Sequence, residues 1–565
     1  MTTAASTPWT AHYSDGVPAQ IPEPTESLID VLDASIMRYR AQVALQFFGA
    51  ETTYAELGEQ IRRAAEGLRK LGVRPGDRVA LVLPNCPQHV VAFYAVLRLG
   101  AIVVEHNPMY TAREMRHQFE DHGATVAIVW SNTAPMVQSL PADAAVDTVV
   151  SVDVTRAMPM MTRAALRLPL PSARAARAAL TRTTRGTVSW EELLAGRALS
   201  KQHPRPQVHD DAVLQYTSGT TGRPKGARLT HFNLVANAAQ GRAWVPGIRE
   251  GDETVYAVLP MFHAYGLTLC LSFAMSIGAR LVLFPKFDEK MVLDAARKHP
   301  PTFLPAVPPI YQRLAVAAKK RKISLRAARF SISGAMTLPP STVELWEATT
   351  GGLLIEGYGL TETSPICLGN PMGETRRPGT VGVPFPSTTI RVVDPDNVEH
   401  DVARSEPGEL LVHGPQVFAG YWKRPEETAE VLLDGGWLRT GDIVTVDEDG
   451  FVTIVDRIKE LIITGGFNVS PSEVEETLRQ HDSVSDAAVV GLPTADGGEE
   501  VVAAVVMNSG ATLDEENIRT FCRSTLAAYK VPRRVVEMPD LPTSLIGKVL
   551  RREVRRHLLG EPEED

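Results

Sequence analysis

Hydroxyls, glycines and one lysine crowd into a single stretch of this chain, residues 217–226, which reads Thr-Ser-Gly-Thr-Thr-Gly-Arg-Pro-Lys-Gly. Glycines let the backbone turn where a Cβ would clash, so several amide groups can point at one anion. Hydroxyls donate to phosphate oxygens, and an ammonium adds a point charge. A polyphosphate would use all of these groups, and the candidate residues are Thr217, Ser218, Gly219, Thr220, Thr221, Gly222 and Lys225.

The alternative for this stretch is an ordinary polar surface turn, which has a similar composition. A strand-like apolar run at residues 212–216 leads straight into it, and this favours a binding loop. The stretch is not a Walker P-loop, because Lys225 follows Pro224 and precedes Gly226 instead of leading through Ser or Thr into a helix.

A second candidate is the run Gly-Tyr-Gly-Leu-Thr-Glu-Thr at residues 357–363, predicted as a glycine turn after a short strand at 352–356. Its glycines allow close approach to a flat ligand, Tyr358 offers a face for stacking, and Glu362 offers a hard oxygen for Mg²⁺. Alone, Gly-Tyr-Gly is a weak signal. Behind a polyphosphate loop in the same chain, it indicates a nucleotide site.

Single residues at predicted strand ends and turns complete the candidate chemistry. His263 follows a predicted strand at 255–260, where ligands of α/β folds collect, although a lone histidine is more often structural. Asp442, predicted in a tight turn, could accept both hydroxyls of a ribose or could be a plain turn residue. Lys548 stands on a glycine turn before a basic helix, where most lysines are simply solvated.

The elements that would position these residues follow an α/β pattern. An apolar stripe predicts a helix over 56–71, and a strand at 79–83, a helix at 87–100 and a strand at 124–130 follow. This order favours parallel α/β packing. From about residue 460 a small α/β domain is predicted, opening with a capping box at Ser470 and Glu473.

Length and composition narrow the class of protein. A chain of 565 residues is too long for one core, so at least two domains are expected. Its net charge of −8 gives no reason to expect nucleic acid. Four widely spaced cysteines exclude a zinc motif by spacing and predict free thiols in a reducing, cytoplasmic compartment. Neither a signal peptide nor an apolar run of membrane-spanning length is expected.

Residues 155–185 depart from this acidic average, with seven arginines and no acid. Arg163 with Arg167, and Arg174 with Arg177, would share faces of short helices. One interpretation is a solvated basic linker. The other is a patch that meets an anionic membrane surface.

Taken in order, these segments resemble the motif set of the acyl-adenylate-forming (AMP-binding) superfamily, over roughly residues 25–560. The runs at 214–216, 386–388, 414–422 and 465–469 are most similar to those of bacterial long-chain fatty-acyl-CoA synthetases. The resemblance implies an α/β fold. Its large N-terminal domain, residues 1–456, would hold mixed α/β subdomains and a small β-barrel-like subdomain, and a small mobile C-terminal domain would span 460–565.

The resemblance also implies roles for particular residues. Residues 217–225 would hold the ATP phosphates, with Thr217 and Glu362 near Mg²⁺. The mobile catalytic lysine would be Lys548, and His263 would face the acyl carboxylate. The other cofactor-binding residues would be Gly334, Ala335, Glu356, Gly357, Tyr358 and Thr361 around the nucleotide, Asp442 and Arg457 on the ribose, the hinge Lys459 (Asp in many relatives), and Gly465 and Gly466 beside the CoA arm.

The implied activity is an ATP- and CoA-dependent synthetase acting on a medium- to long-chain fatty acid through acyl-AMP. An aryl-CoA ligase and a fatty acyl-AMP ligase that loads a carrier protein are alternatives within the class. A degenerate adenylate-binding module without turnover is an alternative outside it. The expected partners are fatty acid, ATP, Mg²⁺ and CoA, with peripheral contact to an anionic membrane and no nucleic acid.

Overall fold

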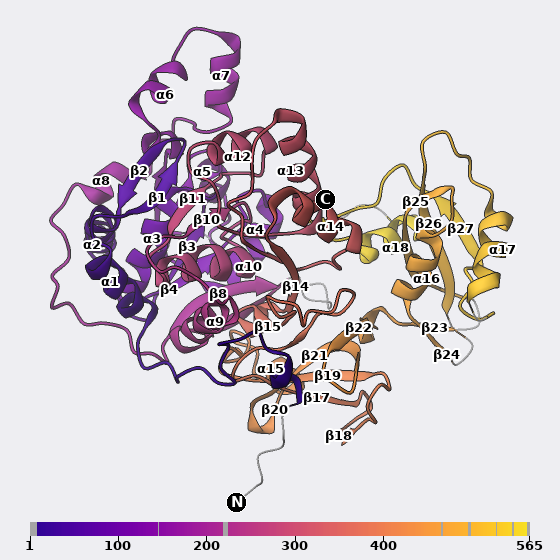
Figure 1. The fold of residues 1–565 in the computed structure, drawn as a ribbon. Helices are drawn as coiled ribbons and strands as arrows, with labels where there is room; N and C mark the ends of the chain where they lie inside the picture. The colour runs from indigo at the N-terminus through magenta and orange to yellow at the C-terminus, as the bar shows by residue number, and fades with distance from the viewer. Residues whose placement is uncertain are drawn as a thin grey trace, which may run out of the picture. The chain divides into compact units, whose positions relative to one another are not determined.

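The computed structural model describes residues 8–144, 146–217, 224–464, 467–494, 499–526, 528–544 and 547–561. The chain divides into two compact units. Unit 1 comprises Met1–Thr389 and His413–Leu438, and unit 2 comprises Ile390–Val412 and Arg439–Asp565. Both units contain helices and strands (Figure 1).

A seven-stranded sheet in unit 1 has the order β7-β6-β5-β3-β4-β8-β9. All its pairs are parallel except β8 with β9. The strands predicted at 79–83 and 124–130 are confirmed as neighbours in it. The strands are β3 (Arg78–Val82), β4 (Ile102–Glu105), β5 (Val126–Trp130), β6 (Thr148–Val152), β7 (Val188–Ser189), β8 (Asp211–Thr217) and β9 (Lys225–Thr230).

A nine-stranded sheet, also in unit 1, has the order β16-β15-β14-β13-β12-β10-β11-β1-β2. Its central strands run parallel, so their carboxyl ends gather at one edge, where ligands of α/β folds bind. The strands are β1 (Val43–Phe47), β2 (Ala50–Thr53), β10 (Thr254–Ala257), β11 (Arg280–Leu283), β12 (Phe303–Ala306), β13 (Phe330–Ser333), β14 (Leu353–Gly359), β15 (Ile366–Gly369) and β16 (Val383–Pro384).

The prediction of a glycine turn directly after residue 356 is wrong. Strand β14 continues through Gly359, because residues 357–359 pair antiparallel with β15. A Cβ on Gly359 would lie 1.8 Å from the carbonyl oxygen of Pro365, so glycine is required there by a close strand contact rather than by a turn.

Helices of unit 1 follow the predicted periodicity. Four residues of the expected stripe, Leu57, Ile61, Ala64 and Leu68, are buried in α2, and Thr53 with Glu56 forms a capping box at its start. The fifth expected member, Leu71, is only half-buried, because it caps the helix end and lies outside it. Every residue of α3 is buried. The longer helices are α1 (Leu28–Arg38), α2 (Tyr54–Lys70), α3 (Pro87–Arg98), α4 (Ala112–His122), α7 (Pro171–Ala178), α9 (His231–Trp244), α12 (Glu289–Ala296), α13 (Pro308–Arg321) and α14 (Pro340–Thr350).

Shorter helical segments connect these elements. They are η1 (Pro8–His12), α5 (Ala134–Gln138), η2 (Val154–Ala157), α6 (Met160–Ala165), α8 (Trp190–Leu194), α10 (Ala264–Gly266), the π-helix η3 (Leu267–Ser272), α11 (Phe273–Ser276), η4 (Thr361–Thr363), α15 (Pro425–Val431) and η5 (Asp434–Gly436). Helices α6 and α7 confirm the short helices predicted in the arginine-rich segment.

A further sheet has the order β18-β17-β19-β21-β20, with β22 paired to β21. The expected subdomain is therefore an open sheet, and the β-barrel-like part of the prediction is wrong, because this path of strand pairing does not close on itself. The strands are β17 (Thr389–Asp394), β18 (Asn397–Asp401), β19 (Gly408–His413), β20 (Leu432–Leu433), β21 (Trp437–Val446) and β22 (Val452–Arg457).

The part of unit 2 from residue 458 onward is a small α/β layer around β25-β26-β27. Alternate residues of its strands enter two separate cores, with Ala487 and Val489 in one and Ala488 and Val490 in the other, as the period of two in a strand requires. The elements are η6 (Ile458–Glu460), β23 (Ile462–Thr464), β24 (Phe467–Val469), α16 (Pro471–Arg479), β25 (Val484–Pro493), β26 (Glu499–Met507), α17 (Glu515–Thr525), β27 (Arg534–Glu537) and α18 (Arg551–Leu559).

Two simpler expectations are met. All four cysteines, Cys86, Cys270, Cys367 and Cys522, are free and buried. None of the helices in the described ranges combines the length and the apolar character that a membrane crossing needs.

Candidate active site

The predicted phosphate loop connects two paired strands in unit 1. Thr217 ends β8 and Lys225 begins β9, and these two residues are partners in the antiparallel register. Ser218, Gly219, Thr220, Thr221 and Gly222 lie outside the described residues. The β-hairpin therefore fixes both ends of the predicted loop.

Lys225 lies against a segment that the chain reaches about two hundred residues later. Its ammonium forms an ion pair with Glu427 and lies 5.1 Å from the ring centroid of Tyr421. Two backbone hydrogen bonds hold this segment along β9. The Arg228 amide donates to the Gly420 carbonyl at 2.9 Å, and the Trp422 amide donates to the Gly226 carbonyl at 2.8 Å.

The same tyrosine contacts Glu362, in η4. The Tyr421 phenol donates to Oε1 of Glu362 at 2.6 Å, and the amide of Phe418 donates to the Glu362 carbonyl at 2.9 Å. Burial raises the pKa of Tyr421, and the negative charge of Glu362 raises it further. The phenol therefore stays protonated and remains a donor. Lys225 and Glu362, which the sequence could not place together, contact one shared side chain.

Gly334, directly after β13, lies beside Gly357, within β14. A Cβ on Gly334 would lie 3.2 Å from the Tyr265 ring and 3.3 Å from the Gly357 carbonyl oxygen. The Tyr265 hydroxyl is fixed by donation to the Ile332 carbonyl at 2.7 Å. Ala335 adopts a φ of 67°, which confirms a turn at this point. Tyr358 is largely buried within β14.

Glu356 is a buried carboxyl at the same sheet edge, with 7% of its surface exposed. Burial raises its pKa to about 8, so at neutral pH the group is mostly protonated and can donate a hydrogen bond. It lines a small open hollow together with Leu338, Asn370 and Arg376. Thr361, five residues further on, begins η4.

His263 lies where the order of the parallel strands reverses. Strand β10 pairs with β11 on one side and with β12 on the other, and His263 follows β10. Crevices at such switch points are the usual ligand sites of open α/β sheets. Its Nδ1 accepts the amide of Tyr265 at 3.3 Å, and burial lowers its pKa, so the imidazole is neutral at pH 7.

The ribose candidates belong to unit 2. Asp442 is buried within β21 and pairs in register with Arg457 at the end of β22. Its prediction as a tight-turn residue is therefore wrong, because β21 continues past Gly441 through Val446. Lys459 lies in η6. Gly465 and Gly466 lie outside the described residues.

Lys548 stands in a narrow turn of unit 2. Its amide donates to the Ser544 hydroxyl at 3.1 Å, and its carbonyl accepts the Ser544 amide at 2.7 Å. Gly547, with a φ of 81°, supplies the left-handed residue before it, as predicted. The isolated bridge between Thr543 and Val549 closes the turn.

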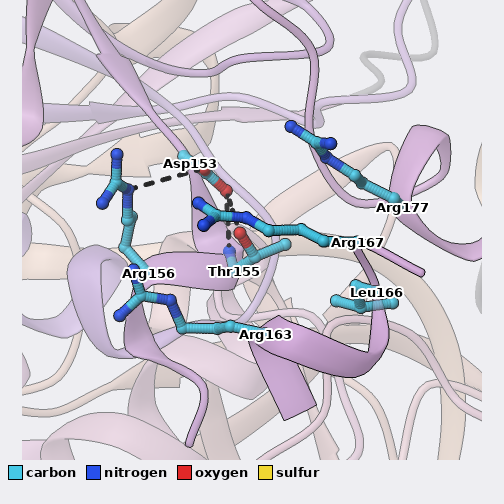
Figure 2. A pocket seen from close by; sticks show the side chains of 7 residues that line it. All are labelled: Asp153, Thr155, Arg156, Arg163, Leu166, Arg167 and Arg177. Carbon is cyan, nitrogen blue, oxygen red and sulfur yellow. Dashed lines mark hydrogen bonds and ion pairs between the residues drawn. The ribbon is translucent and has the colours of Figure 1, made fainter. Parts of the chain in front are cut away.

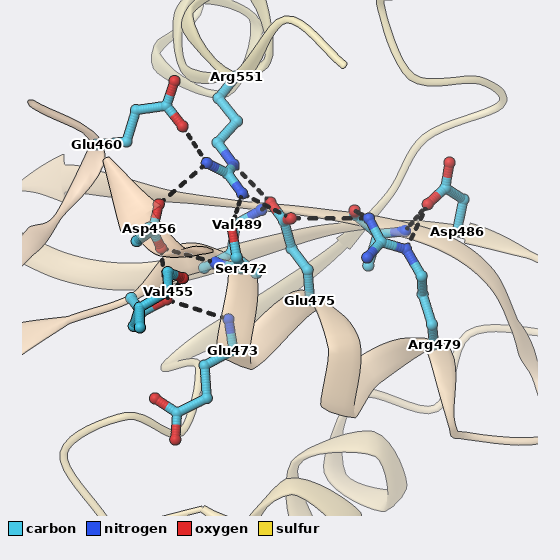
Figure 3. A network of polar contacts seen from close by, with 12 residues as sticks. Val455, Asp456, Glu460, Ser472, Glu473, Glu475, Arg479, Asp486, Val489 and Arg551 are labelled. Atoms are coloured by element: carbon cyan, nitrogen blue, oxygen red, sulfur yellow. Dashed lines mark hydrogen bonds and ion pairs between the residues drawn. The ribbon is translucent and has the colours of Figure 1, made fainter. Parts of the chain in front are cut away.

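Three residues after Lys548, Arg551 ties the start of α18 to the segment around Lys459 (Figure 3). Its guanidinium donates two bonds of 2.8 Å to Glu475, pairs with Glu460, and lies 3.6 Å from Asp456. Burial alone would lower the pKa of Arg551, but bonding to Glu475 and the nearby carboxylates raise it above its ordinary value. The arginine is therefore a fixed positive charge.

A dedicated protein cage for a metal is not found among the described residues, where no group of three or more His, Cys, Asp or Glu side chains lies close enough to hold an ion. Mg²⁺ bound through phosphates needs only one or two carboxylates, because water and phosphate oxygens fill its remaining positions. The Glu362 carboxylate and the Thr217 hydroxyl suit that kind of site.

Sequence reasoning missed Tyr421 and Glu427 as members of this site. Tyr421 lies in the run 414–422, whose only signal was its likeness to a family motif. Glu427 lies beyond that run and carried no signal. A tyrosine and a glutamate after a Gly-rich run carry no periodicity that points to a lysine two hundred residues earlier.

Comparison with known proteins supplies a context for this geometry. Residues 32–422 match the family described as AMP-binding enzyme, and residues 473–548 match its C-terminal domain. A long-chain-fatty-acid–CoA ligase of Bacillus subtilis is 38% identical over 96% of this chain and 97% of its own length. A feruloyl-CoA synthase of an Amycolatopsis species is 35% identical over 91% of this chain and 95% of its own.

Solved structures agree in fold. The crystal structure of ATP-bound MatB from Rhodopseudomonas palustris superposes with a TM-score of 0.78 at 30% identity, and the match covers 94% of this chain and 99% of that one.

Proposed function

The chain belongs to the AMP-binding enzyme family, and from that premise we propose that it is an ATP- and CoA-dependent acyl-CoA synthetase for a medium- to long-chain fatty acid. In the first step the fatty carboxylate attacks the α-phosphorus of ATP, giving acyl-AMP and pyrophosphate. In the second the CoA thiol attacks the acyl carbonyl, giving the thioester and AMP.

The observation that supports this best is the cluster of Lys225, Tyr421 and Glu362 beside the hairpin at Thr217. It sets an ammonium and a carboxylate beside the two ends of a loop rich in glycine and hydroxyls. Phosphoryl transfer of this kind depends on positioning and charge neutralisation, so no side-chain nucleophile is needed.

In this proposal Lys225 and residues 217–222 hold the ATP phosphates. Glu362 and Thr217 hold Mg²⁺, which when bound neutralises phosphate charge. Gly334, Ala335 and Gly357 form the surface for adenine, with Tyr358, Thr361 and the protonated Glu356 beside it. His263, neutral and at the switch point, lies at the carboxylate end of the acyl site.

In unit 2, Asp442 and Arg457 would bind the ribose and Lys548 would act in adenylation. A domain of residues 460–565 would turn about Lys459 relative to residues 1–456, with Gly465 and Gly466 bordering the CoA arm. The family match at residues 473–548 supports a separate C-terminal domain, and the independent core around β25 and β26 is consistent with it.

The test is AMP release by the full chain across a panel of fatty and aryl acids, with and without CoA. We expect AMP release in the presence of CoA to be fastest with fatty acids. The relationship to a feruloyl-CoA synthase favours the aryl-CoA ligase as a second candidate, and preference for cinnamic-type acids would establish it. Acyl-AMP that accumulates whether or not CoA is present would indicate a carrier-loading ligase, and absence of AMP with every acid would leave only a binding module.

We also propose peripheral contact with an anionic membrane, from which a fatty acid could be collected. The support is the segment 155–185, whose seven arginines have no acid among them in a chain of net charge −8.

A further inference from the structure

An arm formed by α6 and α7 stands away from the rest of unit 1 (Figure 1). It is inserted between β6 and β7 in the chain, and two side chains of unit 1 hold its C-terminal end by hydrogen bonds. Trp130 donates to the carbonyl of Leu180 at 2.8 Å, and Asn132 donates to that of Ala178 at 2.9 Å. Met158 is buried at its beginning. The arm is thus anchored at both ends while its helices project into solvent.

A small, open cleft lies at the base of this arm. Figure 2 shows the guanidinium groups of Arg156, Arg163 and Arg167 near Asp153 and Thr155, with Arg177 extending toward them from α7. The residues that line the cleft are Asp153, Thr155, Arg156, Arg163, Leu166, Arg167 and Arg177.

The single acid of the cleft is already engaged. Asp153 accepts the Thr155 amide at 2.9 Å and the Thr155 hydroxyl at 2.6 Å, and it lies 3.8 Å from Arg156. By contrast, Arg163, Arg167 and Arg177 make no side-chain hydrogen bond or ion pair with any residue in the described ranges. Three cations thus face one cleft whose single carboxylate already has other partners, an arrangement suited to an anion.

Exposed apolar side chains belong to the same segment as these cations. Met160 is 82% exposed, Met161 85%, Leu168 49% and Leu170 52%. Large exposed apolar side chains beside arginines are typical of segments that lie in a membrane interface, where the charges contact headgroups and the apolar groups enter the acyl boundary. A soluble phosphate ligand or a nucleic acid would leave these methionines and leucines in water.

We propose that the cleft binds the phosphate of an anionic phospholipid headgroup, with Arg163, Arg167 and Arg177 as its donors. Arginine forks match phosphate oxygens in bidentate pairs, and the exposed methionines and leucines seat the arm on the bilayer. This inference deepens the proposed membrane contact and rests on it. Beyond that contact, it specifies the binding cleft, the arginines that would donate and the phosphate group that they would recognise.

The test is flotation of the full-length protein with vesicles of phosphatidylcholine, alone or mixed with phosphatidylglycerol. The cleft variant is Arg163→Gln/Arg167→Gln/Arg177→Gln. Its matched control is Arg174→Gln/Arg182→Gln/Arg185→Gln, which removes the same charge from the same segment outside the cleft. A third variant, Met160→Ser/Met161→Ser, removes apolar contact alone.

We expect the wild type to bind only the vesicles that contain phosphatidylglycerol. The cleft variant should lose about a hundred-fold in affinity and the control less than about ten-fold. The methionine variant should also bind more weakly. Equal loss in both arginine variants would overturn the cleft as a headgroup site and leave a diffuse charge effect.

Two further outcomes would contradict the proposal. Absence of vesicle binding by the wild type would do so directly. Saturable binding of inorganic phosphate at matched ionic strength, lost in the cleft variant and unaccompanied by vesicle binding, would assign the cleft to a free phosphate. AMP release with a water-soluble acid, measured in the same variants, should stay at the wild-type rate, so a failure of this inference is distinct from a failure of the proposed activity.

Discussion

Tyr421 donates its phenol proton to Glu362 across 2.6 Å, although the two residues are separated by 59 positions in the chain. The ring of the same tyrosine lies 5.1 Å from the ammonium of Lys225. One aromatic side chain therefore sets the spacing between a cation proposed to hold phosphate and a carboxylate proposed to hold Mg²⁺. Tyr421 is in this sense a positioning residue.

Replacing Tyr421 with phenylalanine should reduce kcat/KM for adenylation about ten-fold and raise the Mg²⁺ concentration needed for half-maximal rate. A hydrogen bond to a charged group is worth about 1.5–3 kcal/mol, and without it the carboxylate can rotate away from the metal. Acid-dependent pyrophosphate exchange at varied Mg²⁺ measures both effects.

The matched control is Tyr256→Phe, which removes a buried hydroxyl that donates to the His299 carbonyl at 2.7 Å elsewhere in unit 1. It should leave the Mg²⁺ dependence unchanged. If both variants shift the Mg²⁺ requirement alike, Tyr421 supports the fold and does not position Glu362.

Acid should destabilise unit 1 through its buried histidines. Burial lowers the pKa of His106 from 6.5 to about 4, and it also lowers the pKa of His231 to about 4. The unfolded chain binds more protons than the folded chain between these values, so stability is complete above about pH 6.5 and is lost as pH falls toward 4, by about 1.4 kcal/mol per pH unit for each histidine.

His106→Gln should therefore make the unfolding temperature of unit 1 fall less steeply between pH 6.5 and pH 4, even if the variant is less stable at pH 8. The control, His557→Gln, changes an exposed residue of α18 and should leave the slope as it is. Parallel slopes for wild type and His106→Gln would contradict the assignment.

Local patterns were enough to predict much of the fold. The apolar stripe through Leu57, Ile61, Ala64 and Leu68 predicted α2, because its spacing has the period of a helix. Patterns failed where partners distant in sequence decide the conformation. Gly357 and Gly359 are residue types typical of turns, but their pairing with β15 places them in a strand. Pairing with β22 likewise places Asp442 in a strand.

The site residues likewise fall into those that local sequence predicts and those that only distant contacts define. The loop at Lys225 and the Glu362 segment carry local signatures of chemistry, so both were found. Tyr421 and Glu427 carry none, since their role comes from a segment that lies along β9 through backbone bonds to Gly226 and Arg228. Residues such as Tyr421 and Glu427, which contact the functional side chains from a distant segment, can be identified only from the structure.

Arg551→Ala should destabilise unit 2 by about 3 kcal/mol, because it leaves the buried Glu475 carboxylate without its bidentate partner. Hydrogen exchange of peptides from β25 and β26 measures this without relying on unfolding of the whole chain. The control is Arg552→Ala, one residue away and exposed, which should change exchange by less than about 0.5 kcal/mol. Arg551→Lys should recover only part of the loss, since lysine cannot reproduce the fork. Similar exchange in Arg551→Ala and Arg552→Ala would contradict the prediction.

Lys548 should matter for one half-reaction only. Its backbone makes two hydrogen bonds with Ser544: the Lys548 amide donates to the side-chain hydroxyl, and the Lys548 carbonyl accepts the Ser544 amide. The Lys548→Ala change leaves both bonds in place. If the ammonium neutralises charge on the carboxylate and α-phosphate during adenylation, its loss should lower acid-dependent pyrophosphate exchange by about two orders of magnitude or more, the scale of losing one preorganised donor.

Synthetic acyl-AMP with CoA bypasses that step, so Lys548→Ala should form thioester from it at a rate near that of the wild type. Arg552→Ala, which removes a neighbouring exposed cation, should leave both half-reactions intact and thereby exclude a general effect of charge on α18. Hydrogen exchange of β25 and β26 should also match the wild type, which separates this variant from Arg551→Ala. Normal adenylation by Lys548→Ala, or equal loss from acid and from acyl-AMP, would mean that the lysine does not act at the adenylation step.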